Sequence, residues 1–294
     1  MHFDSLVIGN ISFDTNVDYG GQPVDEIGGA VYYSGYSAAA TGSHVAVLAK
    51  ANLSEVDIPK IFSQAENLAV YPVPSPVSTR IVNIYTSPER ERRISRLPSN
   101  AAPFTMEEIP ANVEADVYDL ASLQRGDFSE EFILALSKRG PVALDLQGML
   151  RYAVDGTAVF GDWAAKREVL PHIRYLKADA NEAEIITGLT DRYAAARQIL
   201  EWGCPEVMIT HNTEVIVATP QGIRAEPLRP RNLSGRTGRG DTTFACYLCE
   251  RLHGGIPEAL RYAAACVSLK IETPGPFKGG RKDVLDYIDK FYKA

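Results

Sequence analysis

One short segment of the chain has the composition of a phosphate-binding site. It reads Thr237-Gly238-Arg239-Gly240-Asp241-Thr242-Thr243-Phe244 and stands directly before an amphipathic helical pattern. Two glycines at a helix entry let the backbone approach a ligand closely, and the free N–H groups together with the helix dipole favour an anion there. A transferring phosphoryl group fits such a site.

Asp241 is the acidic residue of this segment and stands at the N-terminus of the predicted helix. A carboxylate at that point can accept the proton of an attacking hydroxyl while the backbone amides stabilise charge on the phosphate. Aspartate is also a favoured N-cap residue, so Asp241 could instead only cap the helix. The segment by itself leaves both roles open.

The elements that would position this segment alternate between strand and helix patterns, which predicts an α/β fold with a mostly parallel sheet covered on both faces, a three-layer α/β/α sandwich. The expected strands are short and apolar on both faces, as buried parallel strands are. We expect strands at residues 6–9, 45–49, 116–121, 142–146, 175–178, 207–210 and 215–218. We expect helices at residues 30–41, 129–139, 181–187, 192–202, 241–253 and 257–272.

Two segments interrupt this alternation, residues 11–27 and 77–97, and both show strand patterns with turns. We predict that they form a small β lid over one end of the main sheet, within a single domain that spans residues 1–294. The proline-rich residues 71–78 are expected to act as a hinge, because proline excludes helix. Exposed lid strands invite edge pairing, so a homodimer through the lid is an arrangement that the sequence allows.

Length and charge limit the class of protein. The 294 residues, 45% of them hydrophobic, suffice for one large domain and a small appendage. A net charge of -7, with the arginines of residues 89–96 interleaved by glutamates, argues against a nucleic-acid partner. No apolar run approaches 18 residues and no signal-peptide pattern opens the chain, so we expect no membrane partner and predict a cytoplasmic location by default.

Cys246 and Cys249 form a C-x-x-C pair with His253 on the same predicted helical face. A zinc site would require a fourth ligand, and none is evident nearby. We therefore predict that these cysteines belong to a buried helix core.

Residues 237–244 resemble the T-G-A-G-D-x-F signature of the ribokinase-like (PfkB) carbohydrate kinases, with Arg239 in place of the usual alanine. Further motifs of that family follow in the expected order over nearly the whole chain. The resemblance implies an ATP- and Mg²⁺-dependent kinase with a ribokinase-like fold. Asp241 would activate the acceptor hydroxyl, and Gly238, Arg239 and Gly240 would form the anion hole. The sequence contains neither a Walker phosphate loop nor a Rossmann glycine motif.

Three further segments resemble the acceptor side of the family. Residues 9–14 are similar to its G-x-x-x-x-D segment, whose acid binds sugar hydroxyls, and residues 28–30 to its glycine pair. Residues 145–151 resemble the D-x-Q-G-x-x-R segment of the inositol-kinase-like branch. A tyrosine at position 33, where the ribokinase branch tends to have asparagine, argues against ribose. The implied substrate-binding residues for a sugar or cyclic polyol are Asn10, Asp14, Gly28, Gly29, Tyr33, Gln147 and Arg151, although Gln147 and Arg151 could simply cap the sheet edge.

The donor side of the family is represented by weaker matches. Asn181 and Glu184 resemble the N-x-x-E motif and share one helical face, which suits a hydrated magnesium ion bound by Glu184 through water. The same spacing also fits a capping box. Thr210 is retained from the T-x-G-x-x-G nucleotide turn, whereas Asn212 and Val215 replace its glycines. Asparagine tolerates a left-handed conformation, so the first replacement is mild.

Residues 263–265 and 273–277 resemble the helix and loop that wall the adenine pocket in this family. The nucleotide-binding residues implied by the resemblance are Asn181, Thr210, Asn212, Pro274 and Gly275. The family often has an aspartate two residues before the signature threonine, which helps to bind a monovalent cation. That position is Gly235 here, so activation by potassium is in doubt.

Two alternatives remain at this point. A nucleoside kinase would present stacking aromatic side chains near the acceptor, for which Tyr32, Tyr33 and Tyr36 are candidates. A ribokinase-fold protein that binds a ligand without turnover is favoured by the missing glycines at positions 212 and 215. The intact Gly238, Gly240 and Asp241 favour catalysis.

Overall fold

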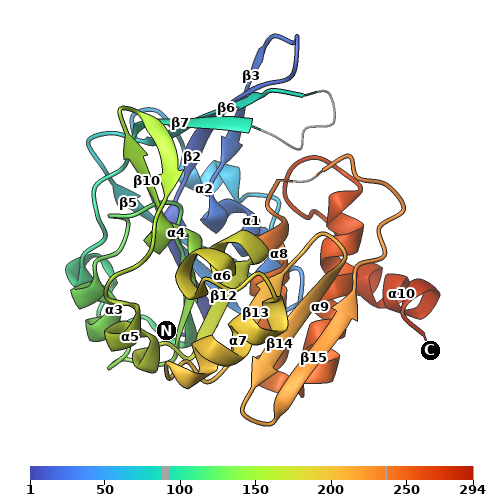
Figure 1. Ribbon diagram of the computed structural model, residues 1–294. Helices are drawn as coiled ribbons and strands as arrows, with labels where there is room; N and C mark the ends of the chain where they lie inside the picture. The colour runs from blue at the N-terminus through green and yellow to red at the C-terminus, as the bar shows by residue number, and fades with distance from the viewer. Residues whose placement is uncertain (88–92, 236, 294) are drawn as a thin grey trace.

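The computed structural model describes residues 1–87, 93–235 and 237–293, and within them the backbone forms two sheets (Figure 1). The larger sheet consists of β1 (His2–Asn10), β4 (Val45–Ala51), β5 (Leu68–Pro74), β8 (Glu114–Ala121), β9 (Val142–Asp145), β12 (Tyr175–Asp179), β13 (Val207–Thr210), β14 (Glu214–Thr219) and β15 (Gly222–Pro227). Their order is β15-β14-β13-β12-β9-β8-β1-β4-β5. Neighbours from β13 to β5 pair in parallel, whereas β14 is antiparallel to both of its neighbours, β13 and β15.

Helices cover both faces of this sheet, which confirms the predicted three-layer α/β/α sandwich (Figure 1). Side chains of α3 (Glu130–Leu136), α5 (Lys166–Val169), α6 (Ala180–Thr187) and α7 (Arg192–Glu201) pack on one face. Those of α1 (Ala30–Ala39), α8 (Arg239–His253) and α9 (Ile256–Ile271) pack on the other, and α10 (Arg281–Phe291) lies against α9. The short helices are α2 (Ile58–Ile61), α4 (Gln147–Leu150), η1 (Met106–Glu108) and η2 (Leu170–His172).

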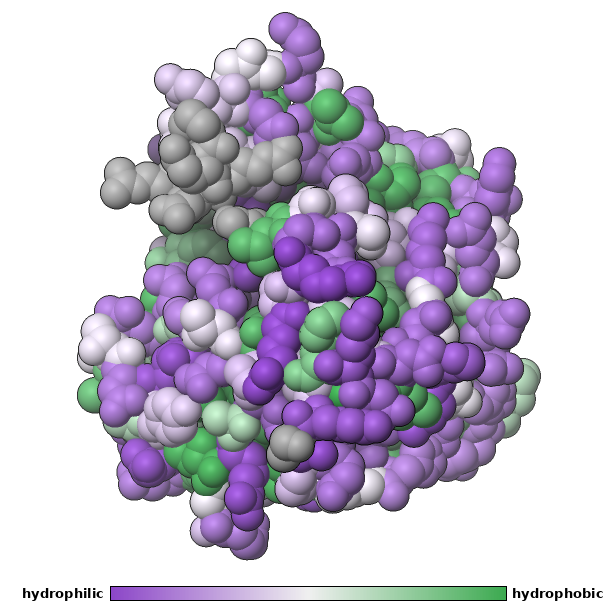
Figure 2. All heavy atoms as spheres, turned by 90° about the vertical axis from the view of Figure 1, so that its right-hand side faces the viewer, coloured by the Kyte–Doolittle hydropathy of each residue, from purple (hydrophilic) through white to green (hydrophobic). Residues whose placement is uncertain are grey.

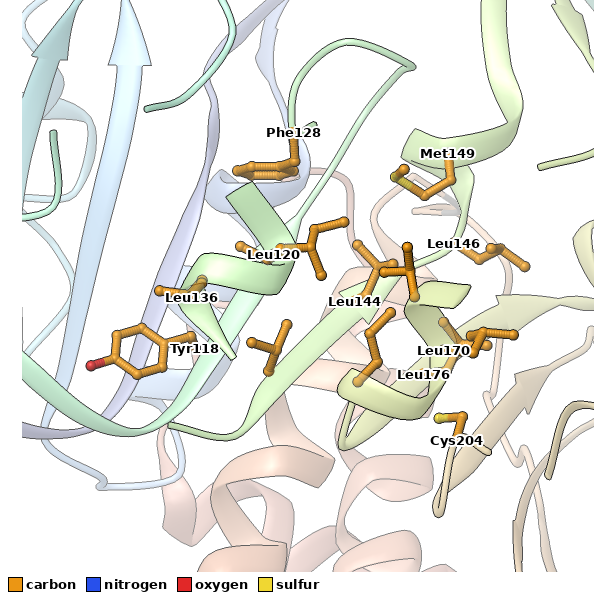
Figure 3. Close-up of a cluster of buried hydrophobic side chains, with 14 of the residues drawn as sticks. Tyr118, Leu120, Phe128, Leu136, Leu144, Leu146, Met149, Leu170, Leu176 and Cys204 are labelled. Atoms are coloured by element: carbon orange, nitrogen blue, oxygen red, sulfur yellow. The ribbon is translucent and has the colours of Figure 1, made fainter. Parts of the chain in front are cut away.

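The core follows from the alternation of side chains along the strands. Leu6 and Ile8 of β1 face one helical layer and Val7 faces the other, so the strand is apolar throughout. Leu120, Leu144 and Leu176 come from three neighbouring strands and belong to the same buried cluster, which Figure 3 shows. Burial of both faces explains why these strands read as continuous apolar runs in the sequence.

The second, smaller sheet has the order β10-β11-β7-β6-β2-β3 and lies beyond one end of the large sheet (Figure 1). Its strands are β2 (Ser12–Val17), β3 (Pro23–Gly28), β6 (Thr79–Tyr85), β7 (Arg93–Ser99), β10 (Arg151–Val154) and β11 (Thr157–Phe160). The first four fall in the two segments for which we predicted a lid; residues 88–92 of the second segment lie outside the described residues. The sequence analysis missed the β10–β11 hairpin, although its Asp155-Gly156 turn, with both φ angles positive, is a strong hairpin signal.

Three other elements differ from the prediction. The proline-rich segment does not form a hinge: Leu68–Pro74 is the edge strand β5, where a proline need not break a ladder hydrogen bond. Strand β15 and helix α10 were not predicted either. The cysteines do belong to the core as predicted, since Cys246 and Cys249 are fully buried in α8 and all four cysteines are free.

The side of the molecule that carries the C-terminal elements is mostly hydrophilic, with apolar atoms only in small groups (Figure 2). Among the described residues, no helix has the length and apolarity that a membrane span requires.

Gly29 is the backbone position that joins the two sheets at the start of α1. Its φ is +107°, and a Cβ there would lie 2.3 Å from the carbonyl oxygen of Asn10. We expect Gly29→Ala to lower the free energy of unfolding by roughly 3 kcal/mol, because strain and a backbone clash add. Gly20→Ala is the matched control: its φ is also positive but the space is open, so it should cost roughly 1 kcal/mol. The free energies of unfolding are measured by urea denaturation, and an equal decrease in the two variants would contradict this account.

Candidate active site

The polar side chains of interest gather where the parallel strands end, below the second sheet. Asn10 ends β1 and Asp145 ends β9, while Lys177 lies near the end of β12. The N-terminus of α8 meets them, because Lys177 lies against Gly240. In open α/β sheets this carboxyl edge is where ligands bind.

Asp241 is the third residue of α8 and is half-buried. The N-cap is Gly238, and no side chain caps this helix, so the alternative that Asp241 serves as the cap is wrong. Burial raises the pKa of Asp241 to about 6, and the charge of Asp145 adds to this shift. Lys177 and Lys270 oppose it. The carboxyl therefore has a pKa suited to a general base near neutral pH.

The two glycines of the signature are required by close packing as well as by a ligand. Gly238 has a φ of +76°, and a Cβ there would lie 2.2 Å from the ring of Tyr33. A Cβ at Gly240 would lie 2.8 Å from Cε of Lys177 and 2.9 Å from its Nζ. The backbone at the start of α8 is thus wedged between a tyrosine ring and a lysine side chain, with its amides at the helix N-terminus.

A buried ion network lies beneath this helix start and was missed by the sequence analysis. Nζ of Lys177 donates to both carboxylate oxygens of Asp145, at 3.1 and 3.0 Å, and lies 3.7 Å from Oε2 of Glu182. Burial alone would lower the pKa of Lys177, but the charges of Asp145 and Glu182 outweigh it and raise that pKa. The available signal was a lysine inside an otherwise apolar predicted strand, which is costly unless the charge is paired.

Asp14 lies on the second sheet and faces the same region. Its Oδ1 accepts a hydrogen bond from Ser12 Oγ at 2.6 Å, and a Cβ on Gly28 would lie 2.4 Å from its Oδ2. Burial raises the pKa of Asp14, while Ser12 and the charge of Arg151 lower it. Tyr33 lies between the two acids: both Asp14 and Asp241 contribute, after burial, to raising the pKa of its phenol.

Two of the predicted substrate-binding residues carry a buried polar atom with no hydrogen-bond partner among the described residues. Arg151 donates its Nε to the carbonyl of Leu123 at 2.8 Å, but its Nη2 is unpaired. Asn10 donates its Nδ2 to Asp127 at 3.0 Å, but its Oδ1 is unpaired. Buried polar atoms are normally hydrogen-bonded, so these two suit the hydroxyls of a bound ligand. Gln147 lies nearby, with Nε2 3.3 Å from the Leu123 carbonyl.

Asp127 was not among the predicted site residues, yet it organises this end of the sheet. It is 1% exposed and accepts hydrogen bonds from Asn10, from Asn100 and from the backbone of Leu123 and Gln124. Helix α3, which follows Asp127 in the chain, is capped by Ser129.

The second sheet presents a row of polar side chains on the face that carries Asp14. Because side chains alternate along a strand, Asn16 shares that face, and Asn83 pairs with it across β2 and β6. Asn83 donates to Asn16 at 3.1 Å and accepts from Ser95 at 2.7 Å, while Asn16 donates to Glu26 at 3.1 Å. The sequence analysis did not single out these residues.

The magnesium motif lies at the start of α6. The capping box of this helix is formed by Asp179 and Glu182, so the alternative that Asn181 and Glu184 form it is wrong. Both Asn181 and Glu184 are exposed on the first turns of the helix. They remain available to a hydrated cation.

Of the residues that the resemblance assigns to the nucleotide, Asn181, Asn212 and Pro274 are exposed, and Thr210 and Gly275 are half-buried. Thr210 ends β13 and its hydroxyl lies 3.4 Å from the carbonyl of Ala178. Asn212 does not take a left-handed φ, since only Asn67 and Asp155 do so among the described residues other than glycine. Val215 is 1% exposed within β14.

The helix expected to wall an adenine pocket is also packed into the core: the side chains of residues 263–265 are fully buried in α9. The loop after β15 is tied to the end of α9, because the backbone and guanidinium of Arg231 donate to Glu272, and to α10, because Tyr287 donates to the carbonyl of Arg229. Pro274 is exposed and Gly275 has a positive φ in the loop that follows α9.

Comparisons with known proteins agree with this architecture. A family model described as pfkB family carbohydrate kinase matches residues 64–279. A pyrophosphate-dependent kinase in the ribokinase family, solved with a pyrophosphate analog and myo-inositol, has 31% identity and a TM-score of 0.86, covering 96% of this chain and 99% of its own. Another structure concerns a pyrophosphate-dependent myo-inositol-1 kinase converted into a myo-inositol-3 kinase by replacing one asparagine and one serine with leucine. It has 29% identity and a TM-score of 0.86, and the match covers 98% of this chain and 100% of that structure's chain.

A cytidine kinase from Thermococcus kodakarensis is 26% identical over 285 residues, which cover 92% of this chain and 94% of that protein.

Asp241→Asn is expected to lower kcat by about 10² to 10⁴, because an amide cannot accept the hydroxyl proton. In the unaltered protein kcat should rise with pH through about 6, since the carboxyl must be deprotonated to act as the base. Both are measured by steady-state kinetics. Glu258→Gln, at the exposed third residue of α9, is the matched control and should leave kcat unchanged. Full turnover by Asp241→Asn would exclude Asp241 as the base.

Proposed function

The chain belongs to the pfkB family of carbohydrate kinases, and within that family we propose that it phosphorylates a hydroxyl of myo-inositol or a similar cyclic polyol with pyrophosphate as the donor. Family membership makes it a phosphotransferase with a hydroxyl acceptor, so the alternative of a binding protein without turnover is set aside. The observation that carries the proposal is a base, Asp241, at a helix N-terminus that two buried lysines flank.

In the proposed mechanism Asp241 accepts the proton of the acceptor hydroxyl as its oxygen attacks the terminal phosphorus of pyrophosphate. The bond from that phosphorus to the bridging oxygen breaks, and orthophosphate leaves. The amides of residues 238–241, together with the charges of Arg239 and Lys177, stabilise the phosphoryl oxygens. The second sheet would act as the lid that excludes water from the reaction.

The acceptor assignment rests on the polar groups around Asp14. A cyclic polyol presents several hydroxyls in fixed directions, and the unpaired atoms of Arg151 and Asn10 supply one donor and one acceptor for them. Asp14 adds a carboxylate, and the row from Glu26 to Ser95 extends these contacts along the lid. The similarity to a kinase solved with myo-inositol supports this polyol class.

The donor assignment departs from the ATP that the sequence motifs imply. Residues 263–265 of α9 and Val215 of β14 are buried and offer no open surface to an adenine, whereas Asn212 and Pro274 are exposed. Positive charge is instead concentrated at the start of α8, where Lys177, Lys270 and Arg239 lie close together. A small, highly charged donor such as pyrophosphate fits this distribution, and two of the similar structures are pyrophosphate-dependent kinases.

Magnesium fits the residues at the start of α6. Asn181 and Glu184 offer amide and carboxylate oxygens on an exposed face, and hard oxygen ligands with retained waters are what Mg²⁺ prefers. We propose that Glu184 holds the ion through water. When bound, the ion would neutralise charge on the donor phosphates.

A nucleoside acceptor is the second candidate, because the cytidine kinase matches most of the chain. The tyrosine side chains that were expected to stack on a nucleoside base have less support in the structure. The ring of Tyr36 stacks on Phe62, and Tyr32 contacts both rings edge-on, so these side chains form a packed cluster.

A panel of donors and acceptors tests the proposal. With magnesium and myo-inositol, kcat/KM for pyrophosphate should exceed that for ATP by at least about tenfold, a difference of about 1.4 kcal/mol. Release of orthophosphate and formation of the phosphorylated polyol are measured together. Preference for ATP would refute the donor, and turnover only with cytidine or another nucleoside would refute the acceptor.

Asn83→Leu combined with Ser95→Leu should change which hydroxyl of myo-inositol is phosphorylated, because the change removes the polar row of the lid. The ratio of positional isomers is read by NMR of the product. Arg96→Leu is the control, since Arg96 neighbours Ser95 on the opposite face of β7. An unchanged isomer ratio in the double variant would exclude the lid row from positional selection.

A further inference from the structure

Lys270 is a buried ammonium group that faces backbone carbonyls. It lies in the last turn of α9 and is 1% exposed. Its Nζ donates to the carbonyl of Gly235 at 3.0 Å and to the carbonyl of Thr237. Both carbonyls belong to the turn that leads directly into Gly238.

These contacts orient the anion site. In a trans peptide unit the C=O of one residue and the N–H of the next point in opposite directions. When the Thr237 carbonyl is held toward Lys270, the N–H of Gly238 is therefore turned away from the lysine. The ammonium group thus controls where one amide at the start of α8 points.

The turn has no room for a side chain at position 235. A Cβ on Gly235 would lie 1.8 Å from the carbonyl oxygen of Thr273, and the Gly235 amide donates to the carbonyl of Ile271 at 2.6 Å. An acidic residue cannot stand here in this conformation. The positive charge beside the carbonyls of Gly235 and Thr237 is therefore that of Lys270.

Lys270 is charged at neutral pH despite its burial. Burial lowers the pKa of Lys270 to about 8, and the nearby Asp241 counteracts that shift. The ring of Tyr33 faces the ammonium, with 5.3 Å between Nζ and the ring centroid. The two carbonyl oxygens and the aromatic face offset the free-energy cost of burying this cation.

We propose that the Lys270 ammonium takes the part of a bound monovalent cation, ordering the turn before the anion site so that the kinase needs no added potassium. The proposal rests on kinase activity but not on the identity of the donor or acceptor. Lys270 acts through the backbone carbonyls of Gly235 and Thr237 and is thus a positioning residue.

The first test uses the unaltered protein. Its kcat should agree within about twofold in chloride salts of potassium, sodium and tetramethylammonium at equal ionic strength, with whichever donor and acceptor support turnover. Strong activation by potassium over tetramethylammonium would overturn the proposal. Failure to find any turnover would instead contradict the proposed function.

The second test uses Lys270→Met. Its kcat should fall by about 10² or more, as when an oxyanion donor is misplaced, with the acceptor KM little changed. Potassium, ammonium or methylammonium should restore part of that loss. Lys282→Met, at a highly exposed lysine of α10, is the matched control and should behave as the unaltered protein.

A readout independent of turnover is the melting temperature. Potassium should raise it in Lys270→Met relative to tetramethylammonium, and should not do so in the unaltered protein. Lys270→Gln keeps hydrogen-bond donors without the charge, and it should show the same cation dependence if the methionine variant does not fold. The proposal would be overturned by a folded variant whose activity and melting temperature are the same in the presence of every cation tested.

Discussion

The placement of the α8 N-terminus between two buried lysines is the interaction on which the site depends. Lys177 packs under Gly240 and pairs with Asp145, while Lys270 binds the carbonyls before Gly238. A buried ammonium without partners costs several kcal/mol, so each lysine constrains the groups that compensate it. The helix start is therefore held in one orientation, and its amides and Asp241 are positioned before any ligand arrives.

The same arrangement sets the chemistry of Asp241. Its pKa lies above that of an ordinary aspartate because the carboxyl is removed from water and lies near Asp145, yet the two lysines prevent a larger shift. This balance leaves a carboxylate that is ionised at neutral pH and still basic enough to accept a proton. The packing of α8 against Lys177 and Lys270 thus contributes to stability and to reactivity at once.

The acceptor and donor sides of the molecule are built differently. The acceptor side combines the end of the large sheet with the second sheet, and it contains unpaired buried groups on Asn10 and Arg151 that call for ligand hydroxyls. The donor side has its positive charge at the α8 entrance, while residues 263–265 and Val215 are buried and Asn212 and Pro274 are exposed. The polyol acceptor and the pyrophosphate donor that we propose rest on the unpaired groups of the acceptor side and on this concentration of positive charge.

The sequence by itself determined the sandwich and predicted the phosphate site, because both depend on local patterns. Apolar runs of strand length define a doubly covered sheet, and Gly238, Gly240 and Asp241 are adjacent in the chain. The order of the family motifs also predicted Asn10, Asp14 and Arg151 as substrate-binding residues. Strand β5 was misjudged because prolines at a sheet edge resemble a linker, and an edge is defined only by the neighbours of a strand.

Tertiary structure alone decided how distant residues compensate each other. Lys177 with Asp145, Lys270 with the Gly235 carbonyl, and Asn83 with Ser95 and Asn16 are contacts across elements, and no local spacing encodes them. The partners of a buried charge or polar atom are the groups that the fold places next to it, because water is excluded from the interior. For that reason the sequence located the base, and only the folded chain determined its pKa and the cations that surround it.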